Sequence, residues 1–194
     1  IEGDAEQTDA RRGAGTYSKI EAAMARLAKN NVLFGTSITV TSQNMHTVLH
    51  QNFVAELRKK GCGLTIYVEY VPAQEGTDAL SLSATQLDTL GAQSAGLKRH
   101  FQGMGGLAFP GDEAAMGGCR ASGRGFFHIN PNGGAEPCPF SPYSKYNLKN
   151  TTMKQVLQSH YFEKLREIAA EAGPHTGGCV LFQRQAQVQA LLAQ

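Results

Sequence analysis

The sequence has little net charge and no long apolar run. Lys and Arg number 18 and Asp and Glu 16, a formal net charge of +2, which excludes the basic excess typical of nucleic-acid-binding proteins. No uninterrupted apolar run approaches the roughly 18 to 20 residues that cross a bilayer, and no basic segment followed by an apolar one begins the chain. We therefore expect a cytoplasmic protein that binds neither nucleic acid nor membrane.

Several catalytic motifs are also missing. Serine residues abound without a GxSxG motif, which leaves serine hydrolase chemistry unsupported, and "GMGG" and "GRG" lack the lysine and helix start of a phosphate-binding loop. His46 and His50 have a spacing that can bind zinc on a helix, but no third ligand is near them in the sequence. We interpret these two histidines as part of a solvated helix face.

The composition is that of a globular protein. The chain has 194 residues, 41% of them hydrophobic, enough to bury a core in one domain or two small ones. The first residue is Ile1 rather than Met, and "IEGD" is typical of the last residues of a strand entering a loop. We therefore expect the chain to be a fragment.

Residues 1–103 alternate between strand and helix patterns. Amphipathic spacing predicts helices, and β-branched runs predict strands. The expected elements are a helix capped by Thr16 or Ser18, a strand over 32–41, a helix capped by Asn44, a strand over 64–72 and a helix over 84–102. This alternation is typical of a parallel sheet with helices outside it, either a partial barrel or an open α/β sheet.

Residues 104–194 differ in composition, and we expect a domain boundary at the change. The segment begins glycine-rich, and "NPNGG" between "GFFHI" and "AEPCPF" predicts a β-hairpin. Helices are expected over 152–159 and 161–171, and a terminal helix over 180–194 with Val188, Leu191 and Leu192 on one side.

The four cysteines carry most of the chemical information. Cys62 stands apart in "GCG" and is interpreted as a small buried residue. Cys119, Cys138 and Cys179 all lie in the second region, each beside glycine or proline. A disulfide is disfavoured without a secretory signal. Spacing alone leaves metal or iron–sulfur ligation, free thiols and a disulfide open.

The segment "GGCRASGRGFFHINPNGGAEPCPF", followed by "NLKNTTMKQVLQSHYFEKLR" and "GGCVLF", resembles a known region. It is similar to the C-terminal auxiliary-cluster region of radical S-adenosylmethionine enzymes of the SPASM and twitch type. "IEGDAEQTDARRGAGTYSKIEAAMARL" looks like the strand end, loop and helix of that family's barrel, and "TVTSQN" and "YVEYVP" look like its fifth and sixth strands. The resemblance spans nearly the whole chain.

The resemblance implies an α/β fold. Residues 1–103 would form the C-terminal part of a partial (β/α) barrel, and residues 104–194 a small α+β auxiliary-cluster domain with a β-hairpin. The family's CxxxCxxC loop, which holds the catalytic [4Fe–4S] cluster, is absent from the sequence. The resemblance implies that this loop lies upstream, in an N-terminal half of the same enzyme, and that this chain alone is inactive.

The resemblance also implies site residues. Cys119, Cys138 and Cys179 would bind one auxiliary iron–sulfur cluster as thiolates. If that cluster is [4Fe–4S], one iron lacks a cysteine, and Asp112, Glu113 and His128 are candidates for it. The residues implied to face S-adenosylmethionine are Glu2, Arg12, Thr39, Asn44, Tyr70, Val71 and Pro72.

The implied activity is radical chemistry. A reduced cluster would cleave S-adenosylmethionine, and the resulting 5′-deoxyadenosyl radical would abstract hydrogen from a substrate, either a peptide or a small molecule. A flavodoxin or ferredoxin would donate the electron, and the auxiliary cluster would relay an electron or anchor substrate. The competing hypothesis is a non-catalytic α/β binding module with a structural zinc site.

Overall fold

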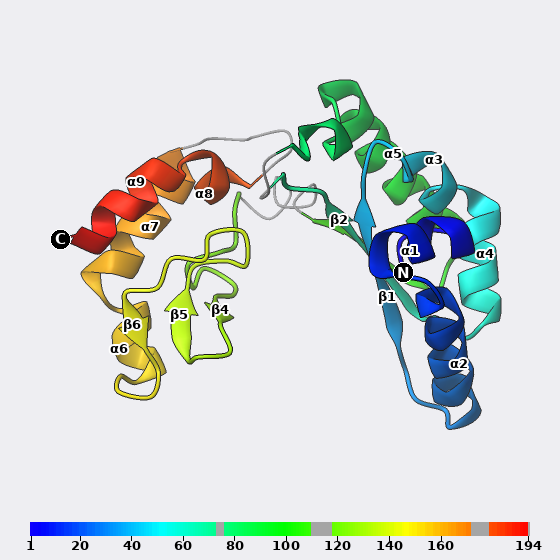
Figure 1. Ribbon diagram of the computed structural model, residues 1–194, viewed down its shortest axis with the longest axis horizontal. Coiled ribbons are helices and arrows are strands. Elements are labelled where there is room, and N and C mark those ends of the chain that lie inside the picture. The colour runs from blue at the N-terminus through cyan, green and yellow to red at the C-terminus, as the bar shows by residue number, and fades with distance from the viewer. Residues whose placement is uncertain (73–75, 110–117, 172–178, 194) are drawn as a thin grey trace. The chain divides into compact units, whose positions relative to one another are not determined.

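The chain divides into two compact units, Ile1–Asp112 and Glu113–Gln194. The computed structural model describes residues 1–72, 76–109, 118–171 and 179–193 (Figure 1). The sequence placed the boundary after residue 103, but the strand Gly105–Phe109 belongs to the first unit because it pairs with that unit's sheet. The sequence did not predict this strand because the segment begins glycine-rich.

The first unit is a three-stranded parallel sheet with helices between its strands, as the alternation predicted. The strand order is β1-β2-β3, and both pairings are parallel. The elements in chain order are α1 (Ala5–Arg12), α2 (Thr16–Lys29), β1 (Gly35–Val40), α3 (Met45–Val48), α4 (Gln51–Lys59), β2 (Leu64–Glu69), η1 (Asp78–Leu80), α5 (Ala84–His100) and β3 (Gly105–Phe109). The partial barrel stays a prediction.

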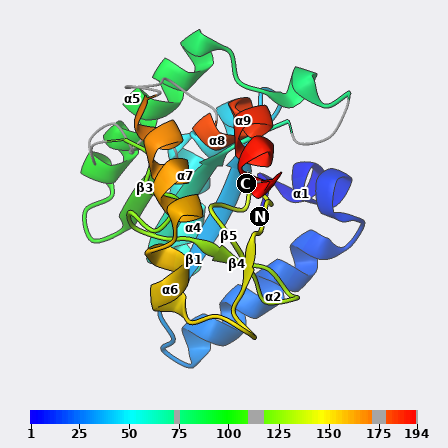
Figure 2. The ribbon, with the colours of Figure 1, turned by 90° about the vertical axis from the view of Figure 1, so that its left-hand side faces the viewer.

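The second unit is a small antiparallel sheet with short helices. The expected hairpin is confirmed, since β4 pairs with β5 in antiparallel register, and β6 adds a third strand that was not expected. Its elements are β4 (His128–Ile129), β5 (Gly134–Glu136), β6 (Tyr146–Asn147), α6 (Met153–Leu157), α7 (His160–Glu171), α8 (Val180–Gln183), α9 (Gln185–Ala190) and η3 (Leu191–Ala193). Figure 2 looks onto this unit, where α7, α8 and α9 lie together.

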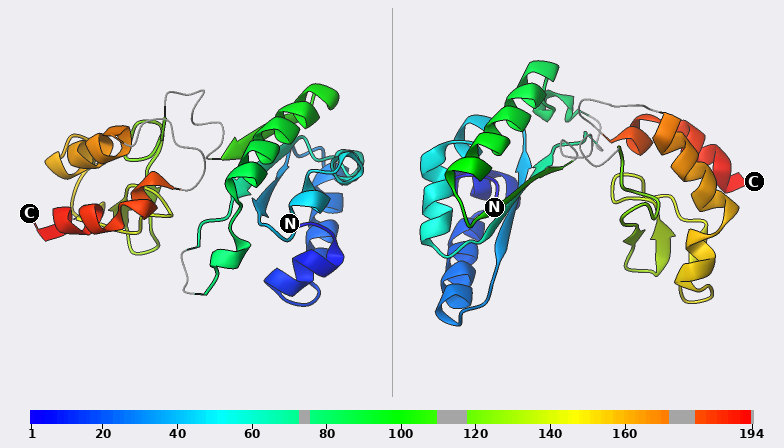
Figure 3. Two further views of the ribbon diagram at one scale, coloured as in Figure 1. Left: turned by 90° about the horizontal axis from the view of Figure 1, so that it is seen from above. Right: turned by 180° about the vertical axis from the view of Figure 1, so that it is seen from behind.

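The core of the first unit lies between the sheet and its helices. Buried residues alternate along β1 and β2, as expected when one face of a strand packs inward. Ile38 and Tyr67 of the strands share this core with Leu57 of α4 and with Leu90 and Leu97 of α5. Figure 3 shows α4 and α5 on one side of the sheet.

Some helix starts differ from the sequence prediction. Thr16 is the first residue of α2, whose N-cap is Gly15 with no capping side chain, so neither Thr16 nor Ser18 caps it. Asn44 makes no capping hydrogen bond either, because its amide is used elsewhere. His50 caps α4 instead, with its Nδ1 atom accepting from the N–H of Asn52 (3.2 Å).

The two ends of the chain also differ from expectation. Residues 1–3 form no strand, although the Ile1 amino group donates to the Ser37 carbonyl (3.3 Å). The expected terminal helix breaks at Arg184 into α8 and α9. Val188 is fully buried as predicted, whereas Leu192 is 37% exposed. No helix within the described ranges is long and apolar enough to cross a membrane.

The register of β1 against β2 predicts that alanine substitutions at two glycines change the free energy of unfolding in opposite directions. A Cβ atom on Gly35 would lie 2.7 Å from the Leu64 carbonyl oxygen, whereas one on Gly91 in α5 would meet no atom of the described residues within 4 Å. Gly35→Ala should therefore lower the free energy of unfolding by about 1 to 3 kcal/mol. Gly91→Ala should raise it by about 0.5 to 1 kcal/mol. Urea denaturation measures both, and a neutral Gly35→Ala would contradict this strand register.

Candidate functional site

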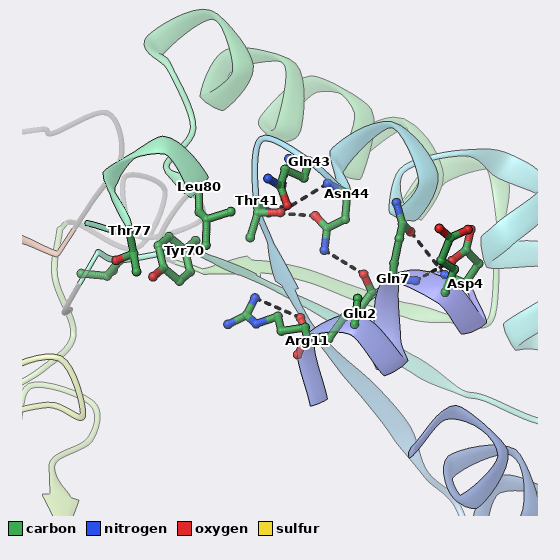
Figure 4. Close-up of a pocket in the computed structure, with 13 residues that line it drawn as sticks. Glu2, Asp4, Gln7, Arg11, Thr41, Gln43, Asn44, Tyr70, Thr77 and Leu80 are labelled. Atoms are coloured by element: carbon green, nitrogen blue, oxygen red, sulfur yellow. Dashed lines mark hydrogen bonds and ion pairs between the residues drawn. The ribbon is translucent and has the colours of Figure 1, made fainter. Parts of the chain in front are cut away.

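A pocket of about 910 Å³ opens in the first unit where two parallel strands end (Figure 4). Thr41 and Asn44 follow β1, and Tyr70 and Val71 follow β2. The carboxyl ends of parallel strands are where open α/β folds bind ligands. The helix α1, which the sequence analysis did not predict, contributes further lining residues. The position of the pocket thus follows from the sheet topology.

Glu2 is the buried charge of this pocket. Its side chain is 2% exposed and pairs with two guanidinium groups. Arg11 donates to Oε2 at 3.2 Å, and the Nε of Arg12 donates to Oε1 at 2.7 Å. The Arg11 guanidinium also lies 5.4 Å from the centre of the Tyr70 ring, within the range of a cation–π contact. An anion, a cation and an aromatic face therefore adjoin within one pocket.

Asn44 joins the first residues of the chain to the end of β1. Its Oδ1 accepts from the N–H of Thr41 (2.8 Å), and its Nδ2 donates to the carbonyls of Glu2 and Thr39 (both 2.8 Å). A side-chain amide has two donors, and both are now used. Asn44 can thus offer a ligand only a lone pair of its oxygen, and its main role in the structure is to hold Glu2 in place.

The pocket contains some of the residues proposed for S-adenosylmethionine. Glu2, Asn44, Tyr70 and Val71 line it, whereas the described lining residues do not include Arg12, Thr39 or Pro72. Thr39 contributes its carbonyl to Asn44, and Arg12 reaches Glu2 from an exposed position.

Sequence reasoning missed Gln7 and Arg11, both pocket residues on α1. The signal for this helix was present in the sequence. Asp4 and Gln7 form a capping box, in which the Asp4 carboxylate accepts from the N–H of Gln7 (2.9 Å). An acidic or hydroxyl residue followed three positions later by Gln or Glu is the usual mark of a helix start.

The second unit brings three cysteines together. Cys119, Cys138 and Cys179 are buried cysteines outside any disulfide, and they come from the loop before β4, the turn after β5 and the residue before α8. A hydrogen bond with the Cys179 thiol, burial, and the nearby Cys179 and Cys119 sulfurs raise the pKa of Cys138. The N–H of Phe140 has the opposite effect on this pKa. The thiols therefore lie close enough to influence one another's protonation.

The fourth cysteine is structural, as predicted. Cys62 is 3% exposed in the first unit's core, and its thiol donates to the Leu64 carbonyl (3.1 Å). His46 and His50 are both exposed, in agreement with a solvated helix face.

The thiols do not form a ready site for a single metal ion. In the part of the chain that the structure describes, no group of three or more His, Cys, Asp or Glu side chains is arranged to hold one. Asp112 and Glu113 lie outside the described residues. His128 is engaged by Glu136, with 2.8 Å between its Nδ1 and the carboxylate oxygen, and Asn130 donates to the other oxygen (2.6 Å).

The burial of Glu2 predicts a stability effect. Glu2→Gln removes the charge that Arg11 and Arg12 contact, so it should lower the free energy of unfolding by about 1 to 3 kcal/mol. The matched control is Glu56→Gln, since Glu56 pairs with Lys59 and both side chains are exposed, so this substitution should change stability by less than about 0.5 kcal/mol. Chemical denaturation measures the free energy of unfolding of both variants. Equal losses of stability would mean that the ion pairs of Glu2 contribute no more than a surface ion pair.

Comparison with known proteins identifies the fold. No protein-family model and no curated protein matches the sequence. Two solved structures of the radical S-adenosylmethionine enzyme anSMEcpe, an anaerobic sulfatase-maturating enzyme, are similar in fold. The structure with AdoMet and the Cp18Cys peptide bound has a TM-score of 0.62 and 16% identity over 88% of this chain and 53% of that one.

The structure of anSMEcpe with AdoMet and the Kp18Cys peptide gives a TM-score of 0.60 and 17% identity, over 88% of this chain and 52% of that one. This chain thus spans about half the length of the enzyme that it resembles. The similarity includes most of both units and shows that they have the fold of the corresponding part of anSMEcpe.

Proposed function

We propose that this chain is part of a radical S-adenosylmethionine enzyme whose second unit holds an auxiliary iron–sulfur cluster. The observation that carries the proposal is the meeting of three buried cysteines from separate segments in a chain with the fold of an AdoMet-binding enzyme. Neither part would be sufficient alone, because folds host many functions. Together, the cysteines of the second unit and the fold of the chain support the proposal.

The thiols fit a cluster better than a single ion. Cysteine thiolates are soft ligands suited to iron, and each ligand of a cluster binds a different iron atom. The sulfurs therefore need not converge on one point, in keeping with the lack of a single-ion site among the described residues. Cys119, Cys138 and Cys179 would be the ligands, and each must lose its proton on binding. A bound cluster would relay an electron or anchor substrate.

The pocket of the first unit would bind S-adenosylmethionine. Its volume of about 910 Å³ lies within the range of small-molecule sites. The ligand combines a flat base with a charged amino-acid end, and the pocket combines Tyr70 and Val71 with the charges of Glu2 and Arg11. Asn44 would hold the loop that carries Glu2, while Arg12, Thr39 and Pro72 would act from just outside the lining.

The whole enzyme would need more than this chain. The sequence contains no CxxxCxxC motif, so we do not propose that the chain cleaves S-adenosylmethionine by itself. An electron would come from a flavodoxin or ferredoxin, and the radical made from S-adenosylmethionine would abstract a substrate hydrogen. The peptides bound to anSMEcpe favour a peptide over a small metabolite as the substrate.

Anaerobic reconstitution with iron and sulfide tests the cluster. The wild-type chain should become brown and bind about four irons and four sulfides. Cys138→Ala and Cys179→Ala should lose most of this iron, because each removes a ligand. Cys62→Ala is the matched control, since Cys62 is equally buried but lies in the core of the first unit, and it should retain the iron. Stoichiometric zinc with no iron after anaerobic purification would instead support the structural zinc module.

Binding of S-adenosylmethionine to the chain tests the pocket. Tyr70→Ala should weaken binding about tenfold in equilibrium dialysis, since contact of an aromatic ring with a base contributes about 1 to 3 kcal/mol. Tyr17→Ala is the matched control, because Tyr17 also has a cation over its ring, that of Lys60 at 5.6 Å, but is not among the described pocket residues. Equal affinities of the two variants would exclude Tyr70 from the site.

A further inference from the structure

Two buried serine hydroxyls in the second unit have no role in the described hydrogen bonding of the fold. Ser122 and Ser141 are both fully buried, and neither Oγ atom has a hydrogen-bond partner among the residues that the structure describes. Buried hydroxyls are usually paired, because leaving one without a partner costs free energy. Each of these two therefore needs an explanation, and both lie in segments that carry a cysteine.

Ser141 belongs to the same turn as Cys138. Its N–H donates to the Cys138 carbonyl (2.9 Å), and the two residues form an isolated β-bridge. The turn thus pairs the backbone of Cys138 with that of a buried serine whose hydroxyl has no partner among the described residues.

Ser122 belongs to the loop of Cys119 and is tied to the other cysteine segment. Its N–H donates to the carbonyl of Pro137 (3.1 Å), the residue before Cys138, and its own carbonyl accepts from Arg166 (3.2 Å). Its φ angle of +56° is in the left-handed region, where glycine is the least costly residue. A serine here adds backbone strain and a buried hydroxyl together, a combination that indicates a function for the hydroxyl.

We propose that the hydroxyls of Ser122 and Ser141 donate hydrogen bonds to sulfur atoms of the cluster held by Cys119, Cys138 and Cys179, and that they thereby raise its reduction potential. This inference rests on the proposed function. Reduction adds negative charge to the cluster, and hydrogen bonds to its sulfurs stabilise that charge. The serines would be tuning residues rather than ligands, and their apparent lack of partners would reflect the acceptors that a cluster supplies.

The test uses the 194-residue chain reconstituted anaerobically with iron and sulfide. Ser141→Ala should keep the wild-type iron content but lower the equilibrium constant for one-electron reduction about tenfold, a shift of about 59 mV to more negative potential. An anaerobic redox titration followed by electron paramagnetic resonance measures this shift. Ser144→Ala is the control, since Ser144 is exposed and donates to the Tyr146 carbonyl (2.9 Å), and its potential should equal that of the wild type.

Two substitutions at Ser122 distinguish the effect of losing the hydroxyl from the effect of backbone strain. Ser122→Ala and Ser122→Gly both remove the oxygen, but only glycine relieves the positive φ angle. The two variants should therefore share the same lowered potential while Ser122→Gly has the higher melting temperature. A potential that follows melting temperature instead would assign Ser122 a purely structural role and overturn its part in the proposal.

The remaining outcomes separate this inference from the proposed function. If the wild-type chain binds no iron, the cluster itself is wrong and the inference falls with it. If all variants bind equal iron at equal potential, only the tuning role is overturned. If a folded serine variant loses its iron, that serine is a ligand rather than a donor, which also overturns the tuning role.

Discussion

The amide of Asn44 connects the parts of the first unit on which the pocket depends. It joins the carbonyl of Glu2, the carbonyl of Thr39 and the N–H of Thr41 through three hydrogen bonds of 2.8 Å. Because this amide is buried, losing any one of these bonds would leave a buried polar group unpaired. The first residues of the chain are thus held against the end of β1, and the charge of Glu2 is held at the pocket.

Both units use the segments just outside regular structure for their chemistry. In the first unit the loops after β1 and β2 line the pocket, and in the second the loop before β4 and the turn after β5 carry Cys119 and Cys138. Loops can do this where a rigid framework fixes their ends. The framework is the parallel sheet in one unit and the hairpin with its packed helices in the other.

Elements with strong local signals could be predicted, and elements defined by distant partners could not. The β-branched run of β1 and the leucine spacing of α5 indicated their structures, because local periodicity reflects a buried face. β3 begins with two glycines, and its pairing with β2 makes it a strand. Asn44 looked like a helix cap, but its partners Glu2 and Thr39 are brought to it by the fold.

The sequence by itself determined the kinds of groups available, which include three cysteines beside glycine or proline and polar residues after two strands. The tertiary structure alone decided which of them meet. Cys179 follows Cys138 by a long stretch of chain, and only the fold brings the two close enough for the Cys179 thiol to raise the pKa of Cys138. The buried state of Ser122 and Ser141 was likewise invisible in the sequence, because burial depends on contacts between distant segments and not on the spacing of residues along the chain.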